Sequence, residues 1–297
     1  MLLKQQDFYR SLTALSPGLV ERIRRTIEES EKKFSKKKDG KAGFLWEHTV
    51  LVAAQSFRLA QTEKENADLA ALVALFHDAG KFAGGRYHHG DKPEEEEAAR
   101  IARATLEETG LKMADIGHVV RALRSLYQSG ASRSRLADIV HDADFLSKFG
   151  YLGVANFFVK STLRGRNLES AAMDYLSKEL TYAAVLPANM RTAAARRLAV
   201  KKSADTLKFY RAYIGELKEA HGMDLRVRTV DVPTSRGRGR KAQVTLVLPV
   251  CCGACGGKWE SAFRTEKGLK CETLEASLRC TACDERRSIS FCLPEMA

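Results

Sequence analysis

The first 250 residues of this 297-residue chain contain no cysteine, and all seven cysteines lie between Cys251 and Cys292. Disulfide frameworks are typical of secreted chains, and the N-terminal stretch MLLKQQDFYRSL lacks the long apolar centre of a signal peptide. The sequence also has no apolar run long enough to cross a bilayer. These absences argue against a secreted or membrane-spanning protein, so we expect a cytoplasmic protein without a membrane partner.

The overall composition is that of a globular protein. Hydrophobic residues make up 44% of the chain, which is enough for one large core or two ordinary ones at this length. The formal net charge of +12 favours anionic partners such as nucleotides, nucleic acid or anionic lipid head groups. Charge alone does not choose among these partners.

Strand patterns are absent between residues 46 and 222, where apolar residues recur at a spacing of three to four positions. A helix predicted at 93–110 has proline at its start and glycine at its end, as helices often do. An earlier helical pattern covers residues 5–34 and is followed by a basic loop. The other predicted helices cover residues 46–61, 67–80, 117–127, 134–150, 152–165, 168–186 and 188–222.

The pattern changes after residue 222. Residues 225–232 and 242–250 are short, alternating and rich in β-branched side chains, which predicts strands. The segment PTSRGRGRK between them carries three arginines and a lysine beside proline, glycine and serine. We therefore expect the two strands to form a hairpin with a basic tip.

Two histidines and two aspartates stand in otherwise apolar helical segments. His48 lies in LWEHTVLV, His77 and Asp78 lie in LVALFHDAGKF, and Asp144 lies in IVHDADFLSKFG. Burying such groups is costly unless each has a partner. Imidazole nitrogens and carboxylate oxygens together suit Mn, Fe, Co, Ni, Mg or Zn, and fewer than six protein ligands leave room for water and substrate. The pattern favours one divalent ion in the middle of a helical bundle.

These residues resemble the H…HD…D signature of the HD-domain metal-dependent phosphohydrolases. The resemblance covers roughly residues 46–222, where the helices are similar to those of bacterial HD hydrolases that act on nucleotides. It implies that His48, His77, Asp78 and Asp144 are metal ligands, with Asp142 a weaker claimant to the last role. Asp142 and Asp144 would not share a helical face.

The chain departs from the family members that bind two metals, which usually supply further histidines from the next two helices. Here the helix that starts at Pro93 carries four glutamates instead, and the following helix has Tyr127 near its end. The sequence therefore predicts one ion at this site. His88 and His89 could replace the missing histidines, contact phosphate or lie in a solvated turn.

The predicted chemistry is hydrolysis of a phosphate ester or anhydride, because a divalent ion activates water and polarises a phosphoryl oxygen. We predict catalytic roles for Asp78 and Lys81, with Asp142 or Glu47 as other carboxylates able to orient the water. The predicted substrate-binding residues are Lys81, Arg86, His88, His89 and Lys92, whose charges would neutralise phosphate.

The cysteine-rich segment predicts a second metal site. Cys252 and Cys255 form one two-residue-gap pair, and Cys280 and Cys283 form another, which is the spacing of a four-cysteine zinc ribbon. An iron–sulfur cluster and a redox disulfide are alternatives, and Cys251 could compete with Cys252. A closed four-cysteine zinc site would be structural and would fold a segment too small to build its own core.

Taken together, the sequence predicts a mainly α protein with an HD-type helical bundle and a small C-terminal β zinc-ribbon domain. The predicted limits are 1–40 for an N-terminal helical extension, 41–222 for the phosphohydrolase domain and 223–297 for the hairpin and ribbon. The expected substrate is a small phosphorylated molecule, in the first place a nucleotide. The alternatives are an HD-type nuclease and a non-catalytic nucleic-acid-binding protein that uses the basic hairpin and ribbon. The oligomeric state is not predicted.

Overall fold

The computed structural model describes residues 6–38, 44–82, 93–127, 133–163, 187 and 190–221, and the backbone of five strands that begin at residue 224. The chain divides into two compact units. The first comprises Met1–Ser147 and Met190–Leu198, and the second comprises Lys148–Asn189 and Ala199–Ala297. Each unit is described by itself below.

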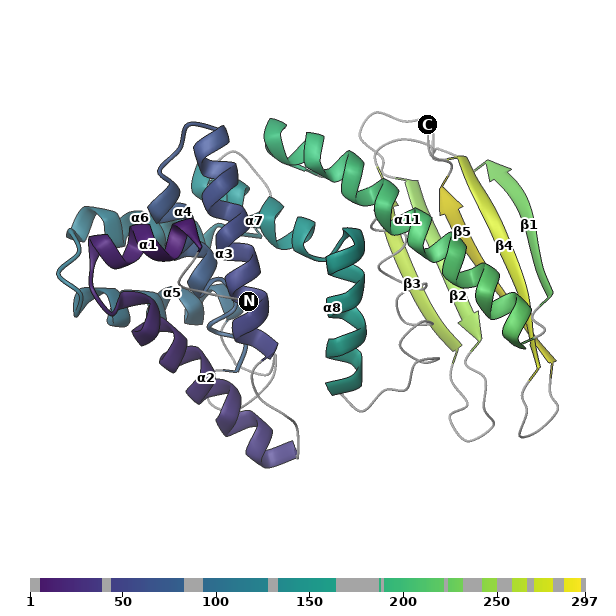
Figure 1. Ribbon diagram of the computed structural model, residues 1–297, viewed down its shortest axis with the longest axis horizontal. Helices are drawn as coiled ribbons and strands as arrows, with labels where there is room; N and C mark the ends of the chain where they lie inside the picture. Colours follow the sequence, from purple (N-terminus) through teal and green to yellow (C-terminus); the bar gives the residue numbers. More distant parts are fainter. Residues whose placement is uncertain are drawn as a thin grey trace. The chain divides into compact units, whose positions relative to one another are not determined.

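The described part of the first unit is helical (Figure 1). Its helices, in chain order, are α1 (Asp7–Leu15), α2 (Leu19–Lys38), α3 (Phe44–Thr62), α4 (Ala67–Phe76), α5 (Glu94–Glu107), α6 (Met113–Arg124) and α7 (Arg135–Ser147). The start of α11 (Ala193–His221) also belongs to this unit. The expectation of a mainly helical fold is confirmed for these residues.

The first helical pattern is divided into two helices rather than continuous. The sequence predicted helical spacing over residues 5–34, but α1 ends at Leu15 and α2 starts at Leu19. Between them, Pro17 has no backbone N–H to continue a helix, and Gly18 adopts a positive φ of 77°. The apolar periodicity runs on across this break, which is why the pattern alone did not reveal it.

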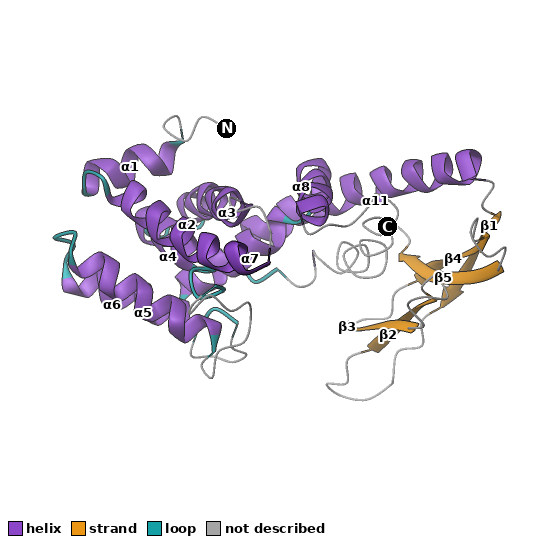
Figure 2. Ribbon diagram, turned by 90° about the horizontal axis from the view of Figure 1, so that it is seen from below, coloured by secondary structure: helices purple, strands orange, loops and turns teal. Residues whose placement is uncertain are grey.

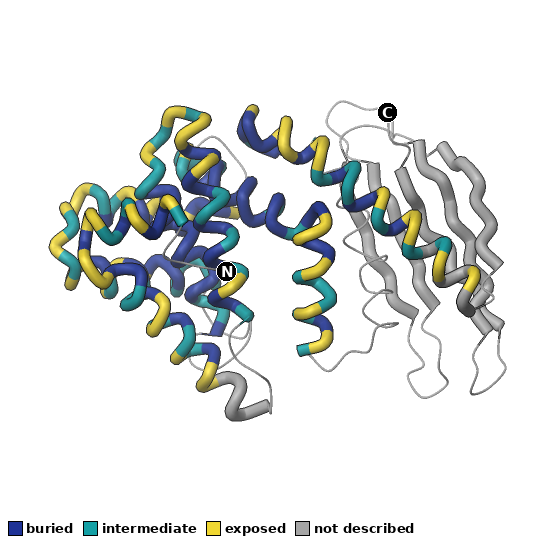
Figure 3. The backbone as a smooth tube through the Cα atoms, in the orientation of Figure 1, coloured by how far each residue is buried: buried dark blue, intermediate teal, exposed yellow. Residues whose placement is uncertain are grey.

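Helix α4 is the centre of the first unit. It packs against α3, α6 and α7, and every residue from 69 to 76 is buried (Figure 3). Asn66 caps its N-terminus, because the side-chain oxygen accepts a hydrogen bond of 3.0 Å from the Leu69 N–H. Each large apolar side chain buried here stabilises the fold by about 1.5–3 kcal/mol relative to exposure. The α4 C-terminus is therefore held rigidly in the middle of the bundle.

The turn that follows α4, residues 77–82, lies directly against the start of α5. An added Cβ at Gly80 would come within 2.3 Å of the Glu94 carbonyl oxygen and 3.0 Å of the Ala98 nitrogen. Only glycine fits such a close backbone approach. Helix α5 in turn lies beside α6 (Figure 2), and the Arg124 guanidinium forms a two-pronged ion pair with Glu96 across the pair. The first turn of α5 is thus fixed beside the end of α4.

The second unit contains α8 (Gly150–Leu163) and most of α11. Gly150, at a φ of +74°, donates its N–H to Thr206 Oγ1 at 2.7 Å, and Lys202 donates to the Phe149 carbonyl oxygen at 3.1 Å. These bonds join the start of α8 to α11. The helix predicted at 168–186 lies outside the described residues. None of the helices that the structure describes meets the length and hydropathy needed to span a membrane.

The chain then forms five strands, which confirms the change of pattern after residue 222. They are β1 (Asp224–Asp231), β2 (Ala242–Pro249), β3 (Lys258–Thr265), β4 (Lys270–Arg279) and β5 (Arg286–Pro294). One sheet has the order β1-β4-β5, the other pairs β2 with β3, and all of these pairings are antiparallel.

The predicted hairpin between the first two strands is wrong. The strands themselves lie where the sequence predicted them, but β1 pairs with β4, with Val227 opposite Leu274, and β2 pairs with β3. The prediction assumed that neighbours along the chain also pair in space. β4 instead has β1 on one edge and β5 on the other, so a strand distant in sequence takes the place of β2. The basic segment 233–241 lies outside the described residues.

Candidate metal centre

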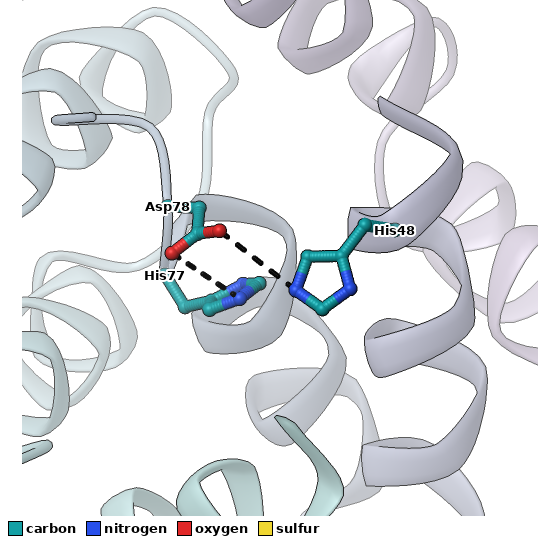
Figure 4. Close-up of side chains that lie close together, drawn as sticks. All are labelled: His48, His77 and Asp78. Carbon is teal, nitrogen blue, oxygen red and sulfur yellow. Dashed lines mark ion pairs between the residues drawn. The ribbon is translucent and has the colours of Figure 1, made fainter. Parts of the chain in front are cut away.

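Three helices bring the two histidines and two aspartates together. His48 comes from the second turn of α3, His77 and Asp78 follow the end of α4, and Asp144 comes from α7. His48 Nε2 lies 3.2 Å from Asp144 Oδ1 and 3.8 Å from Asp78 Oδ2, while His77 Nε2 lies 3.5 Å from Asp78 Oδ1 and 3.9 Å from Asp144 Oδ1. Figure 4 shows the His48 and His77 rings beside the Asp78 carboxylate. The four predicted ligands therefore face one another.

The group formed by His48, His77 and Asp78 is compact enough to hold one ion, with ligand atoms all within 4.8 Å of one another. Asp144 stands next to this group through its contacts with both histidines. Nitrogen and carboxylate oxygen donors in this combination suit a divalent transition metal.

His77 carries the clearest sign that these residues fit a cation. Its side chain is fully buried, and Nδ1 lies 2.6 Å from the Ala74 carbonyl oxygen, which can only accept a hydrogen bond. Nδ1 therefore carries the proton and Nε2 keeps its lone pair. Within the described part of the chain Nε2 has no hydrogen-bond partner. A buried lone pair of this kind is costly unless it binds something, and a metal ion satisfies it.

The charges of the cluster also suit a cation. Burial lowers the pKa of His48 below its ordinary value despite the nearby Asp144 carboxylate, so His48 is neutral at pH 7 and able to bind metal. Burial alone would raise the pKa of Asp78, but His77, Lys81 and His48 outweigh it and hold this pKa below its ordinary value. At neutral pH the cluster thus combines a neutral His48 with an ionised Asp78, the forms in which these side chains bind metals.

Lys81 lies at the edge of the cluster. Its Nζ donates to Asp78 Oδ2 at 2.6 Å, and its side chain is 21% exposed. Burial would lower the pKa of Lys81, but the Asp78 carboxylate outweighs it, with a smaller contribution from Glu94, and the net pKa is raised. Lys81 is therefore a cation at neutral pH that touches the predicted metal ligand set.

Asp142 lies apart from this cluster, on another side of α7. Its carboxylate is fully buried and accepts hydrogen bonds from the backbone N–H of Arg191 at 3.0 Å and of Thr192 at 2.7 Å, just before α11. The His141 ring nitrogen Nδ1 lies 3.1 Å from Asp142 Oδ1. These partners saturate Asp142, so Asp144 is the only one of the two aspartates that faces the histidines. Glu47, the other carboxylate considered, is exposed on α3.

Two residues beside the cluster were missed by the sequence analysis as contributors to the site. Tyr127 donates from Oη to Asp144 Oδ2 at 3.2 Å, and burial together with Asp144 and Asp78 raises the pKa of its hydroxyl. Arg191 donates from its guanidinium to the carbonyl oxygen of Leu126, next to Tyr127, at 3.0 Å. Tyr127 stood out only as a residue in place of an expected histidine, and no local pattern marked Arg191.

The other predicted site residues lie outside the described residues. They are Arg86, His88, His89 and Lys92 near the helical site, and Cys252, Cys255, Cys280 and Cys283 in the cysteine-rich segment. Their roles stay predictions.

The comparisons with known proteins agree with the helical site. The family model for the HD domain matches residues 45–148, the span that carries His48, His77, Asp78 and Asp144. Residues 45–148 form an HD domain. No protein among those with curated descriptions matches the chain.

Solved structures match a larger part of the chain. A structure described as a predicted HD superfamily hydrolase, from an uncultured Thermotogales bacterium, is 21% identical with a TM-score of 0.50, over 70% of this chain and 97% of that one. An HD-superfamily hydrolase from Bacillus thuringiensis is 22% identical with a TM-score of 0.47, over 67% and 97%. Bacillus subtilis YpgQ in complex with ADP is 20% identical with a TM-score of 0.45, over 68% and 96%. The match at a TM-score of 0.50 shows a shared fold over 70% of this chain.

Proposed function

We propose that this protein is a metal-dependent phosphohydrolase that acts on nucleotides or a related small phosphorylated substrate. The observation that carries the proposal is the convergence of His48, His77, Asp78 and Asp144 from three helices around one position. The buried Nε2 of His77, which has no hydrogen-bond partner in the described ranges, supports a bound cation at this position. The HD domain at residues 45–148 supports hydrolase chemistry for the same residues.

We propose two kinds of role for these residues, binding the ion and contacting the substrate or water. His48, His77, Asp78 and Asp144 would hold one divalent ion; when bound, such an ion lowers the pKa of water and polarises a phosphoryl oxygen. Asp78, which keeps its negative charge well below neutral pH, would orient a water near the cluster by accepting a hydrogen bond from it. Helix α4 and the turn after it keep these groups in place without any change of fold.

Lys81 is the residue that we propose contacts the phosphate. Its ammonium group is held 2.6 Å from Asp78 Oδ2 and is partly exposed, so it can reach a substrate that arrives beside the ion. A phosphoryl oxygen carries negative charge that increases as the bond to the leaving group breaks, and a fixed cation stabilises it. This accounts for a lysine three residues after the ligand Asp78, on the same turn.

A nucleotide panel tests the proposal. Purified protein with added Mn, Ni, Co or Mg is expected to release phosphate or pyrophosphate from at least one nucleotide, and His77→Ala and Asp78→Ala are expected to reduce the rate by a factor of 100 or more, on the order of the loss of a metal ligand. His118→Ala, at an exposed histidine of α6, is the matched control and should keep the wild-type rate.

The same experiment distinguishes the alternatives. Cleavage of single-stranded nucleic acid with no turnover of any nucleotide would replace the proposal by an HD-type nuclease. Tight strand binding that survives His77→Ala, without turnover of any substrate, would indicate a binding protein whose helical site is not catalytic.

We also propose a structural zinc site for Cys252, Cys255, Cys280 and Cys283. Each cysteine pair belongs to a connection whose flanking strands pair with each other: Pro249 is opposite Lys258, and Arg279 is opposite Arg286. Strand β2 lies beside β5 and runs in the opposite direction, so the end of β2 and the start of β5 lie on the same side (Figure 1). Two cysteine pairs that follow β2 and precede β5 suit a shared tetrahedral ion.

Elemental analysis tests this second site. The wild-type protein is expected to contain one zinc that is lost in Cys280→Ser, whereas Cys292→Ser, in the middle of β5, should keep it. Unchanged zinc content in Cys280→Ser would refute the assignment.

A further inference from the structure

The two oxygens of Asp144 face different surroundings. Oδ1 lies 3.2 Å from His48 Nε2 and 3.9 Å from His77 Nε2, on the side of the proposed ion. Oδ2 accepts a hydrogen bond of 3.2 Å from the Tyr127 hydroxyl. A carboxylate can bind a cation through one oxygen or both, so a donor on Oδ2 decides which of these modes is available.

A hydrogen bond to the neighbouring residue, Leu126, supports the position of Tyr127. It lies just after α6, in a turn whose Leu126 carbonyl oxygen accepts a hydrogen bond of 3.0 Å from the Arg191 guanidinium. The backbone N–H of Arg191 also donates to Asp142, which is two residues before Asp144 on α7. Arg191 therefore links the turn that carries Tyr127 to the helix that carries Asp144. The Tyr127 side chain is 44% exposed, so its ring reaches solvent while its hydroxyl reaches the carboxylate.

We propose that Tyr127 is a positioning residue that holds the Asp144 carboxylate through Oδ2, so that Oδ1 alone is presented to the cation, and that Arg191 supports the turn that carries it. The inference rests on the proposed metal-dependent function. It adds two residues, from the turn after α6 and from the segment before α11, to a site built from α3, the end of α4 and α7.

One-oxygen binding has a chemical consequence for this site. An Asp144 that binds through both oxygens occupies one more coordination position than an Asp144 that binds through Oδ1. With Oδ2 engaged by Tyr127, that position stays available for water or a phosphoryl oxygen. Hydrogen bonds to metal-binding side chains typically change metal affinity or activity by about 10-fold to 100-fold when they are removed.

The test uses Co²⁺, because its visible absorption reports the number and arrangement of its ligands without any substrate. In the full-length protein, Tyr127→Phe is expected to weaken Co²⁺ binding by about 10-fold and to shift the visible spectrum of the bound ion. Tyr151→Phe is the matched control, since Tyr151 is an exposed tyrosine of α8, and it should leave both unchanged. With an active nucleotide, kcat should fall in Tyr127→Phe while KM changes by less than about 3-fold, because the substitution removes no substrate contact.

Arg191→Gln provides a second variant. It removes the guanidinium bonds to the Leu126 carbonyl and to Asp138 but keeps the Tyr127 hydroxyl, and it should shift the Co²⁺ spectrum in the same direction by a smaller amount. Thermal unfolding of the apoprotein checks that both variants fold. If wild type and Tyr127→Phe bind Co²⁺ with the same affinity and spectrum, the inference is overturned while the metal site stands. If the wild type binds no Co²⁺ at the helical site, the proposed function itself fails.

Discussion

Asp142 and Asp144 of helix α7 are only two residues apart, but their carboxylates are surrounded by different groups. Asp142 is surrounded by hydrogen-bond donors, from the backbone before α11 and from His141. Asp144 faces two imidazoles and receives a hydrogen bond from Tyr127. Both carboxylates are buried, but only one is placed where a cation can bind.

The difference shows what distinguishes a structural carboxylate from a proposed metal ligand. Backbone N–H groups at the start of a helix supply hydrogen bonds and a favourable dipole, and they leave nothing for an ion to satisfy. Around Asp144 the neighbouring groups include the fully buried His77, whose Nε2 has no hydrogen-bond partner among the residues that the structure describes. A motif that reads Asp-Ala-Asp therefore combines one residue for the fold and one for the site.

Substituting Asp144 is expected to have the largest effect on metal binding. Asp144→Asn keeps the shape and the acceptor for Tyr127 but removes the negative charge beside His48 and His77. Metal affinity should fall by a factor of about 100 or more, and the free energy of unfolding of the apoprotein should change by less than about 1 kcal/mol. Isothermal titration with Mn²⁺ and chemical denaturation in the presence of a chelator measure the two quantities.

Substituting Asp142 is expected to show the reverse pattern. Asp142→Asn replaces a charged acceptor of backbone N–H groups by an amide whose NH₂ group cannot accept them, so the free energy of unfolding should fall by about 2 kcal/mol. Metal affinity should stay within about 3-fold of wild type, because the substitution lowers the stability of the fold and leaves the groups around Asp144 in place. Loss of metal binding in a folded Asp142→Asn protein would mean that the two carboxylates do not have separate roles.

A smaller effect is expected from acid on the metal-free protein. The pKa of His48 is lowered in the folded state, so unfolded chains bind more protons as the pH falls below about 6.5, and stability decreases there. The pKa of Asp78 is also lowered, so its contribution is present above about pH 4 and is lost below that value as the pH approaches the folded pKa. Melting temperatures in chelator from pH 7.5 to 3.5 should fall in both windows. Asp78→Asn should lack the second fall, and a rise on acidification would contradict the assignment.

The sequence was sufficient to find the metal-binding candidates, because their order and their apolar helical surroundings are local properties. The sequence alone pointed to His48, His77, Asp78 and Asp144, and the structure brings these residues together. The preference for Asp144 over Asp142 came from the resemblance to the HD-domain signature, and helical geometry added that the two would not share a face. What the four residues bind is still a proposal.

Contacts between distant segments could not be predicted in the same way. Tyr127 meets Asp144 only because α6 and α7 pack around α4, and Arg191 meets Leu126 across 65 positions of sequence. The hairpin prediction was wrong for the same reason, because strand pairing can also join segments that are distant in sequence. The alternating pattern located β1 and β2, but the choice of β4 as the partner of β1 depends on strands that follow much later in the chain.

Gly80 allows a close approach of the turn 77–82 to α5 that no other residue type would preserve. With the backbone oxygen of Glu94 only 2.3 Å from where a Cβ would stand, even a methyl group would act as a wedge between the turn 77–82 and α5. Asp78 and Lys81, which both lie in this turn, would then move together relative to His48 and Asp144 on the neighbouring helices. The position of this pair in the candidate site thus depends on direct contact between the backbones of the turn and α5.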